Sequence, residues 1–286
     1  MRIGILLVAM MALSIVSYGQ SGEQKGLTIA QQNAFLHERV NSGQITGNFA
    51  SFGSFLNAVA DVAIHTEDKT IASTVLHSPF PDFYKPTWKE LFDTIGMQTG
   101  ASWTYDASKN FWVFKRSSIP KPYFVKLADK WTRTDAGISD NFVPSTYPVG
   151  MDIYYYGSYT ADDPKEQAKL SEKVRDTWAI SFASAFKRDV SISDMKTVKV
   201  ADTDALYFET AAPRPGVIWR QWVFVTHGDA FVIVSSLRKD DKQLVTDVEE
   251  MVRSFKYFPY MKWLRQDVVL NYSAEPRAQL AVALAD

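Results

Sequence analysis

Two kinds of hydrophobic periodicity alternate along the chain and predict a mixture of helices and strands. Apolar residues spaced three and four apart indicate helices with one buried face, and apolar residues at every second position indicate strands. In the first 116 residues these patterns predict, in order, a helix over 28–40, an amphipathic stretch over 52–64, a strand over 70–76, a helix over 87–100, and a hairpin of strands over 102–105 and 111–114.

The helix over 87–100 carries clear start and stop signals. Thr87 and Glu90 have the spacing of a capping box, in which each side chain binds the backbone N–H of the other residue. Gly100 is the residue type that most often ends a helix in the left-handed conformation. The polar segment 106–110 has the composition of a hairpin turn. These signals predict a compact strand–helix–hairpin unit.

This unit resembles the short N-terminal domain of the secretin and TonB families. The resemblance covers residues 74–114 and rests on the segments PTWKELFDTIGMQTG and ASWTYDASKNFWVF. It implies an N-terminal α+β domain, whose bounds we place at 20–116.

A second pattern begins after a Pro-containing linker at residues 117–122. There the periodicity predicts, in order, a loop over 140–148, a strand over 150–156, a helix over 164–188, strands over 197–201, 205–210, 217–226 and 230–237, and a closing helix that begins at Asp240 or Asp241. Elements of these lengths suit an antiparallel sheet flanked by helices. The predicted fold class is therefore α+β, with two small domains.

Residues 123–257 resemble the PsbP-like family, which includes the DcrB group of bacterial envelope proteins. The matching segments are YPVGMDIYYYG, VKVADTDALYFE, RQWVFVTHGDAFVIVSS and LVTDVEEMVRSF. The resemblance implies a PsbP-like domain at 123–258, used for docking and binding, with no common catalytic site. A fold alone does not identify the partner. Residues 259–286 form an aromatic tail with a pattern suited to a short helix.

The first nineteen residues have the pattern of a secretory signal. Arg2 supplies a positive charge, the segment 3–16 is almost entirely apolar, and Ser17 and Gly19 occupy the small-residue positions before the cleavage site. The apolar run is short for a bilayer span, for which about 20 residues are needed. An uncleaved anchor is the alternative. We expect cleavage near Gly19, an exported protein that is periplasmic or secreted, and no transmembrane segment in the mature chain.

Composition narrows the classes of function. The formal net charge is −1, which provides no field to attract nucleic acid. The chain contains no cysteine, which excludes disulfides, thiolate metal sites and cysteine nucleophiles.

The polar residues form no recognisable catalytic or metal-binding motif. The four histidines have no ligand spacing, and each is more simply explained as an ordinary surface or turn residue; they are His37, His65, His77 and His227. Two acidic pairs offer oxygen ligands but lie in predicted turns without the spacing of a calcium loop; they are Asp162 with Asp163 and Asp202 with Asp204. We assign no catalytic residue, no metal site and no cofactor.

Aromatic residues in the predicted sheet are the candidate binding residues. Neighbouring residues of a strand face opposite sides of the sheet, so Tyr154, Tyr155 and Tyr156 cannot all enter one core, and neither can Trp219 and Trp222. Either helices cover both faces, or one face offers aromatic rings to a protein partner, sugar or lipid. We take these five residues as candidate ligand- or partner-binding residues.

Two classes of function fit these observations. The first is a non-catalytic envelope protein that acts as a binding or assembly module for a protein partner or small ligand, with an inhibitor or immunity protein as a narrower form. The second is a secreted hydrolase whose active-site carboxylates are scattered in sequence; it predicts a deep pocket in which acidic side chains converge. The oligomeric state is open.

Overall fold

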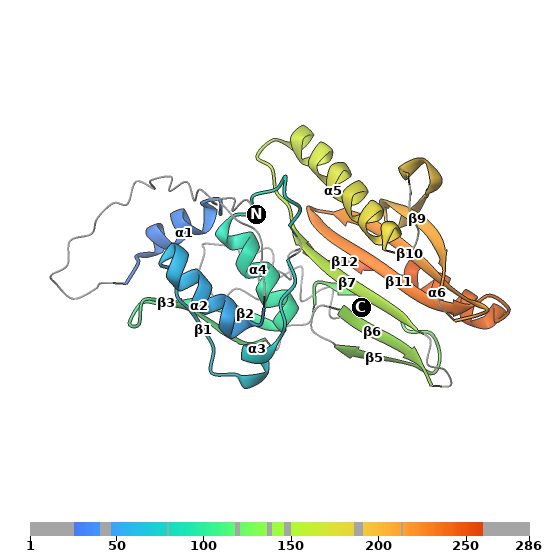
Figure 1. Ribbon diagram of the computed structural model, residues 1–286, viewed down its shortest axis with the longest axis horizontal. Coiled ribbons are helices and arrows are strands. Elements are labelled where there is room, and N and C mark those ends of the chain that lie inside the picture. The colour runs from blue at the N-terminus through green and yellow to red at the C-terminus, as the bar shows by residue number, and fades with distance from the viewer. Residues whose placement is uncertain are drawn as a thin grey trace, which may run out of the picture.

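The structure is a computed structural model that describes residues 26–40, 47–78, 80–117, 121–135, 139–145, 150–185, 191–212 and 214–259. The signal sequence predicted at 1–19 lies outside these ranges, as does the predicted tail beyond residue 259. In the described part of the chain, a small N-terminal unit lies beside one large antiparallel sheet (Figure 1).

The N-terminal unit packs helices against a three-stranded sheet. Its elements are α1 (Ile29–His37), α2 (Phe49–Ala60), β1 (Ile64–His65), α3 (Lys69–Ser73), α4 (Trp88–Thr99), β2 (Ala101–Asp106) and β3 (Phe111–Arg116). The strand order is β1–β3–β2, with β1 parallel to β3 and β2 antiparallel to it. The predicted hairpin and the helix before it are confirmed, including the capping box of Thr87 and Glu90 and the left-handed Gly100.

The strand predicted over 70–76 is wrong. Residues 69–73 form helix α3, because the Asp68 side chain accepts hydrogen bonds from the backbone N–H groups of Thr70 and Ile71 and so caps a helical turn. Only a single bridge, from Val75 to Asn48, has strand pairing in this segment. The Asp68 cap therefore makes this segment helical, although β-branched residues are enriched in strands.

The C-terminal unit is a sheet covered by a helix on each face. Its elements are β4 (Tyr123–Phe124), β5 (Trp131–Asp135), β6 (Ser139–Pro144), β7 (Met151–Ser158), α5 (Pro164–Ser184), the 3₁₀ turn η1 (Ile192–Asp194), β8 (Lys196–Val200), β9 (Thr203–Ala211), β10 (Val217–Thr226), β11 (Asp229–Arg238), α6 (Lys242–Arg253) and β12 (Lys256–Tyr257). Among the described residues, seven strands pair in the order β5–β6–β7–β11–β10–β9–β8. Strands β4 and β12 pair separately.

Strand β6 replaces residues 140–144 of the loop predicted over 140–148, and β5 pairs with it. They form a hairpin in which Arg133 pairs with Phe142. The sequence hid β6 because two of its buried residues, Ser139 and Asp140, are polar. It hid β5 because Thr132 and Thr134 of this edge strand are exposed, so the strand lacks the apolar alternation of a half-buried strand.

The two helices explain why the central strands are apolar on both sides. Val248 and Met251 of α6 pack on one face with Phe224 of β10. Ala179 of α5 packs on the other face with Val223. A strand buried on both faces reads as a continuous hydrophobic run rather than as an alternation.

The two units also share packed side chains. Helix α4 lies against β7, and Met97 of α4 joins the core beneath α6 (Figure 1). In return, Tyr159 and Val174 of the C-terminal unit join the aromatic core of the N-terminal unit. The division into two domains stays a prediction, because these contacts make one continuous interior.

A buried ion cluster fixes the segment that joins the units. Asp140 is fully buried, and its carboxylate lies 3.1 Å from the Lys121 ammonium and accepts hydrogen bonds from Arg133 and Tyr123. Lys121 belongs to the predicted linker, yet only 5% of it is exposed. Such a pair is costly to break, because the remaining charge stays buried without its partner.

We therefore expect Asp140→Ala to lower the free energy of unfolding by about 3–5 kcal/mol. Urea unfolding followed by tryptophan fluorescence measures this loss. The matched control is Asp204→Ala, whose carboxylate lies 2.8 Å from Lys199 in an exposed pair; it is expected to cost less than about 1 kcal/mol. Equal losses in the two variants would contradict the prediction.

Candidate functional site

The five aromatic residues predicted to bind a partner lie on both faces of the large sheet. Tyr155 and Trp222 face α6, with only 3% and 6% of their surfaces exposed. Tyr154 and Tyr156 face α5 and are partly buried. Trp219 is three positions from Trp222 on β10, so it points to the α5 side. The structure therefore does not gather the five residues on one surface.

Helices cover both faces, and Tyr154, Tyr155, Tyr156 and Trp222 belong to the cores beneath them. The Tyr156 ring centroid lies 4.6 Å from that of Trp178 and 5.4 Å from that of Phe182, both on α5. On the other face, the Tyr155 hydroxyl donates a hydrogen bond to Asp229 at 3.0 Å. These contacts describe packing. A binding role for the five residues stays a prediction.

In the described part of the chain, no group of three His, Asp or Glu side chains is placed so that it could hold a metal ion. His227 has a positive φ of 49° in the turn between β10 and β11, as a turn residue does. Asp204 pairs with Lys199 across the β8–β9 turn.

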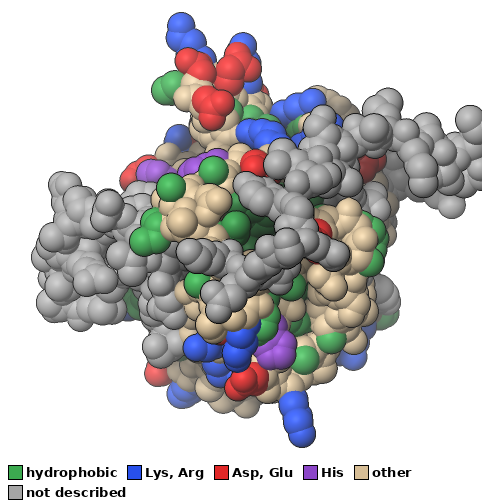
Figure 2. Space-filling model, turned by 90° about the vertical axis from the view of Figure 1, so that its left-hand side faces the viewer, with side chains coloured by type: hydrophobic (Ala, Val, Ile, Leu, Met, Phe, Trp, Pro, Cys, Tyr) green, Lys and Arg blue, Asp and Glu red, His purple; other side chains and the backbone are tan. Residues whose placement is uncertain are grey.

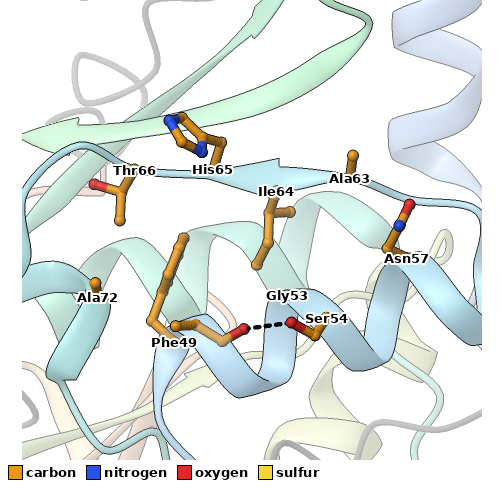
Figure 3. A pocket seen from close by; sticks show the side chains of 10 residues that line it. Phe49, Gly53, Ser54, Asn57, Ala63, Ile64, His65, Thr66 and Ala72 are labelled. Atoms are coloured by element: carbon orange, nitrogen blue, oxygen red, sulfur yellow. Dashed lines mark hydrogen bonds between the residues drawn. The ribbon is translucent and has the colours of Figure 1, made fainter.

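A small hollow of about 300 Å³ lies between α2, β1 and α3. Figure 3 shows Phe49 and Ile64 pointing into the space between the helix and the strand, whereas His65 points away from the helix. The Ser54 hydroxyl donates to the backbone oxygen of Ala50 within α2. This arrangement offers mainly packing side chains and no group of catalytic residues among those that line it.

The outer side of the N-terminal unit is also mixed in character. Phe55 and Val59 of α2 are 49% and 58% exposed. In the surface visible around the grey atoms, hydrophobic side chains are scattered, and charged ones gather toward the top and bottom of the view (Figure 2). This side presents no single chemical character for a ligand.

A larger hollow, of about 520 Å³, lies where the two units meet, and we name it the junction groove. Its walls are Arg39 after α1, the segment 82–85 before α4, Thr160 and Ala161 after β7, and the first half of α5. Ligand sites in proteins occur preferentially at such junctions.

The buried carboxylate of Glu90 does not line the junction groove, but it binds Tyr84 and Thr160, which do. One oxygen accepts the Thr87 N–H at 2.7 Å, which completes the cap of α4. The other accepts the Tyr84 hydroxyl at 2.7 Å and the Thr160 N–H at 2.9 Å, and the Thr160 hydroxyl also donates to it. Since Thr160 follows β7, one side chain joins the N-terminal unit to the large sheet.

Tyr84, which binds Glu90, also contacts Tyr159 and Arg39. The Tyr84 ring lies 5.0 Å from the Tyr159 ring, and the Arg39 guanidinium lies over the Tyr84 ring at 5.6 Å. Arg39 also donates to the backbone oxygens of Lys85 at 2.6 Å and Thr160 at 3.3 Å. These contacts hold a flexible side chain at one end of the groove.

The opposite wall carries two lysines one helical turn apart. Lys169 lies 2.9 Å from Glu166 in an exposed pair, and the Lys173 ammonium lies 4.0 Å from the centre of the Phe83 ring. With Arg39 and Lys85, the groove has four cations against the two carboxylates of Asp82 and Glu166, which leaves a net charge of +2 among its lining residues.

The sequence identified Glu90 as a helix cap but not as the group that binds Tyr84 and Thr160 of this groove. Its second role depends on Thr160, 70 residues later, and no local pattern records that contact. The lysines of α5 gave only a weak sequence signal of a binding site, because charges at three- and four-residue spacing along a helix usually mark a solvated face.

No protein-family profile and no curated protein sequence matches the chain. It is similar to a solved structure of a Bacteroides thetaiotaomicron protein, at 15% identity and a TM-score of 0.35, over 49% of this chain and 47% of that one. The chain thus spans about half the length of that protein. LpqN of Mycobacterium tuberculosis, involved in cell envelope biogenesis, has 13% identity and a TM-score of 0.35, over 50% of this chain and 87% of LpqN. PsbP (CyanoP) of Synechocystis has 10% identity and a TM-score of 0.28, over 55% of this chain and 92% of PsbP.

PsbP is thus among the structures that the chain is similar to, in keeping with the PsbP-like resemblance of residues 123–257. The chain's own elements confirm the α+β class and the helix-flanked antiparallel sheet. Scores this low carry no argument about function. The resemblance of residues 74–114 to the secretin and TonB short N-terminal domain stays a prediction.

Alkaline pH tests the environment of Tyr84. Burial, followed by the charge of Glu90, raises the pKa of Tyr84 from 10.0 to about 12. Between these values the unfolded chain loses a proton that the folded protein keeps, so the stabilisation is complete below pH 10 and lost as the pH rises through 12. We expect the free energy of unfolding of Tyr84→Phe to fall less steeply than that of the wild type, by up to about 1.4 kcal/mol per pH unit.

Urea unfolding at a series of pH values measures both slopes. Below about pH 9 the two curves are expected to run parallel, because Tyr84 is then protonated in both states. Identical slopes above pH 10 would show that Tyr84 ionises as freely as in the unfolded chain.

Removing the Glu90 carboxylate is expected to loosen the junction. Glu90→Ala leaves the Thr87 and Thr160 N–H groups without this acceptor, at a cost of about 2–4 kcal/mol in the free energy of unfolding. Native-state hydrogen exchange is expected to show faster exchange of the Thr160 amide. Glu166→Ala, an exposed carboxylate of the same groove, serves as the control and is expected to change stability by less than about 1 kcal/mol. Unchanged protection of the Thr160 amide in Glu90→Ala would contradict this account.

Proposed function

We propose that the protein is a non-catalytic exported module of the cell envelope that binds a partner in the junction groove. The observation that carries the proposal is the groove itself, where four cations and two carboxylates surround a hollow between two packed units. Arg39 is held there by two backbone oxygens and the Tyr84 ring, so part of the charge is placed before any ligand arrives. A site ordered in advance binds at a smaller entropic cost.

The export part of the proposal is supported by the sequence pattern of residues 1–19, which lie outside the described residues. Within the described ranges, no helix has the length and hydrophobicity to cross a membrane.

The buried carboxylates support a structural rather than a hydrolytic use of acidic residues. Glu90 binds the cap and the junction, and Asp140 binds Lys121 and Arg133. Asp93 accepts the Trp103 indole N–H at 3.1 Å, and Asp229 accepts hydroxyls of the C-terminal unit. None of these four carboxylates lines the junction groove or the hollow beside α2. The hydrolase considered from the sequence would need acidic side chains to converge in an open pocket.

Site-specific crosslinking tests the proposal. A photo-crosslinking residue, p-benzoylphenylalanine, replaces Phe83, which is 39% exposed in the groove. In the producing cells we expect one discrete adduct, identified by mass spectrometry, whose yield falls severalfold when Lys173→Glu is added. The control places the same residue at Val75, which is 60% exposed outside the groove and is expected to give no such adduct.

Adducts of equal yield from both positions, or an adduct at Phe83 that is insensitive to Lys173→Glu, would remove the groove as the binding site. Turnover of a substrate by the purified protein, abolished by a change at one of the buried carboxylates without unfolding, would instead favour the hydrolase.

A further inference from the structure

We propose that the junction groove takes an extended, acidic peptide segment of a protein partner, with carboxylates at alternate positions bound to Lys169 and Lys173. This inference rests on the proposed function, since it names the chemistry of the ligand at the same site.

The spacing of the two lysines matches an extended chain. Lys169 and Lys173 are four residues apart on α5, so they are displaced by about 6 Å along the helix axis. Side chains on one side of an extended peptide recur every second residue, at about 6.6 Å. Two acidic residues with one residue between them therefore reach both ammonium groups from a single strand, without a bend in the ligand.

Both lysines are positioned to exchange their present contacts for a ligand. Lys169 pairs with Glu166, but their side chains are 73% and 62% exposed, and such a pair contributes little to stability. Lys173 lies over the face of Phe83, which directs its ammonium toward the opposite wall of the groove. A carboxylate that arrives here meets a cation whose position an aromatic ring already restricts.

Apolar side chains beside the cations favour a peptide over a free inorganic anion. Phe83 and Leu170 line the same groove and offer contact to the residues that lie between the acidic ones. At the other end, the Arg39 guanidinium has five N–H donors, of which the backbone contacts engage the terminal nitrogens once each. A guanidinium can form a paired hydrogen bond with a further carboxylate of the segment.

The exposed charges of α5 argue against a membrane or nucleic acid as the ligand. Beyond the two groove lysines, the helix carries Lys165 and Arg175, but also Glu166, Glu172 and Asp176. Four cations against three carboxylates give a net charge of +1 for the helix, whereas recognition of an anionic lipid surface relies on clusters of about four to eight basic residues. The excess positive charge of α5 is therefore too small for such a surface.

Fluorescence anisotropy with a synthetic peptide tests the inference. The probe is a fluorescein-labelled peptide of ten residues in which Asp and Val alternate, and the comparison peptide has Asn in place of every Asp. At low salt we expect the Asp peptide to bind and the Asn peptide to bind at least about tenfold more weakly, and we expect binding of the Asp peptide to weaken as salt screens the charges.

Charge reversal on the helix locates the binding. The double variant Lys169→Glu with Lys173→Glu is expected to weaken binding at least about tenfold, because two attractions become two repulsions. The matched control is Lys165→Glu, an exposed lysine of the same helix that does not line the groove, and a change of less than about twofold is expected. Circular dichroism and urea midpoints show whether both proteins remain folded.

Equal binding of the Asp and Asn peptides, or an equal loss in the control variant, overturns the inference. Binding to phosphatidylserine vesicles that the double variant loses, without binding of the Asp peptide, overturns it in favour of a lipid surface. If the Phe83 crosslink depends on Lys173 while the Asp peptide fails to bind, the ligand class is wrong and the proposed function stands. If the crosslink fails as well, both are wrong.

Discussion

The carboxylate of Glu90 is the interaction on which the arrangement of the two units depends. A buried carboxylate is tolerated only when donors replace the water that it loses, and Glu90 receives donors from its own helix cap, from Tyr84 and from Thr160. The first completes α4, and the other two belong to segments that approach from opposite units. The walls of the junction groove follow from this one group, because segment 82–85 and Thr160 are both positioned by it.

Buried carboxylates serve repeatedly in this chain as ties between distant segments. Asp140 binds Lys121 and Arg133, which lie on either side of the start of the C-terminal unit. Asp229, only 1% exposed, accepts the Tyr155 hydroxyl and those of the neighbouring Ser158 and Tyr257. A chain without cysteine has no covalent crosslink to hold such segments. Each of these buried carboxylate contacts is sensitive to the loss of one partner, since the other partner then remains buried without a hydrogen bond.

Local signals predicted the elements well wherever the signal and the structure concern the same few residues. The capping box of Thr87 and Glu90 and the apolar runs of the central strands are examples, and the alternation of Tyr154, Tyr155 and Tyr156 across the sheet was also read correctly. Prediction failed at residues 70–76, where the Asp68 cap changed the pattern, and at 140–144, where β6 buries a polar residue, Asp140. The groove was out of reach because its parts come from four separate segments. Their meeting depends on packing between α4 and β7, which no local window contains.

The pairing of β4 with β12 brings the first and last strands of the C-terminal unit together, with Tyr123 beside Tyr257 and the Tyr123 ring stacked on Phe255 at 5.5 Å. A unit whose entry and exit points adjoin can be inserted into a surface loop of another protein without pulling that loop apart. The start and the end of the unit are therefore joined by two short strands and not by the large sheet.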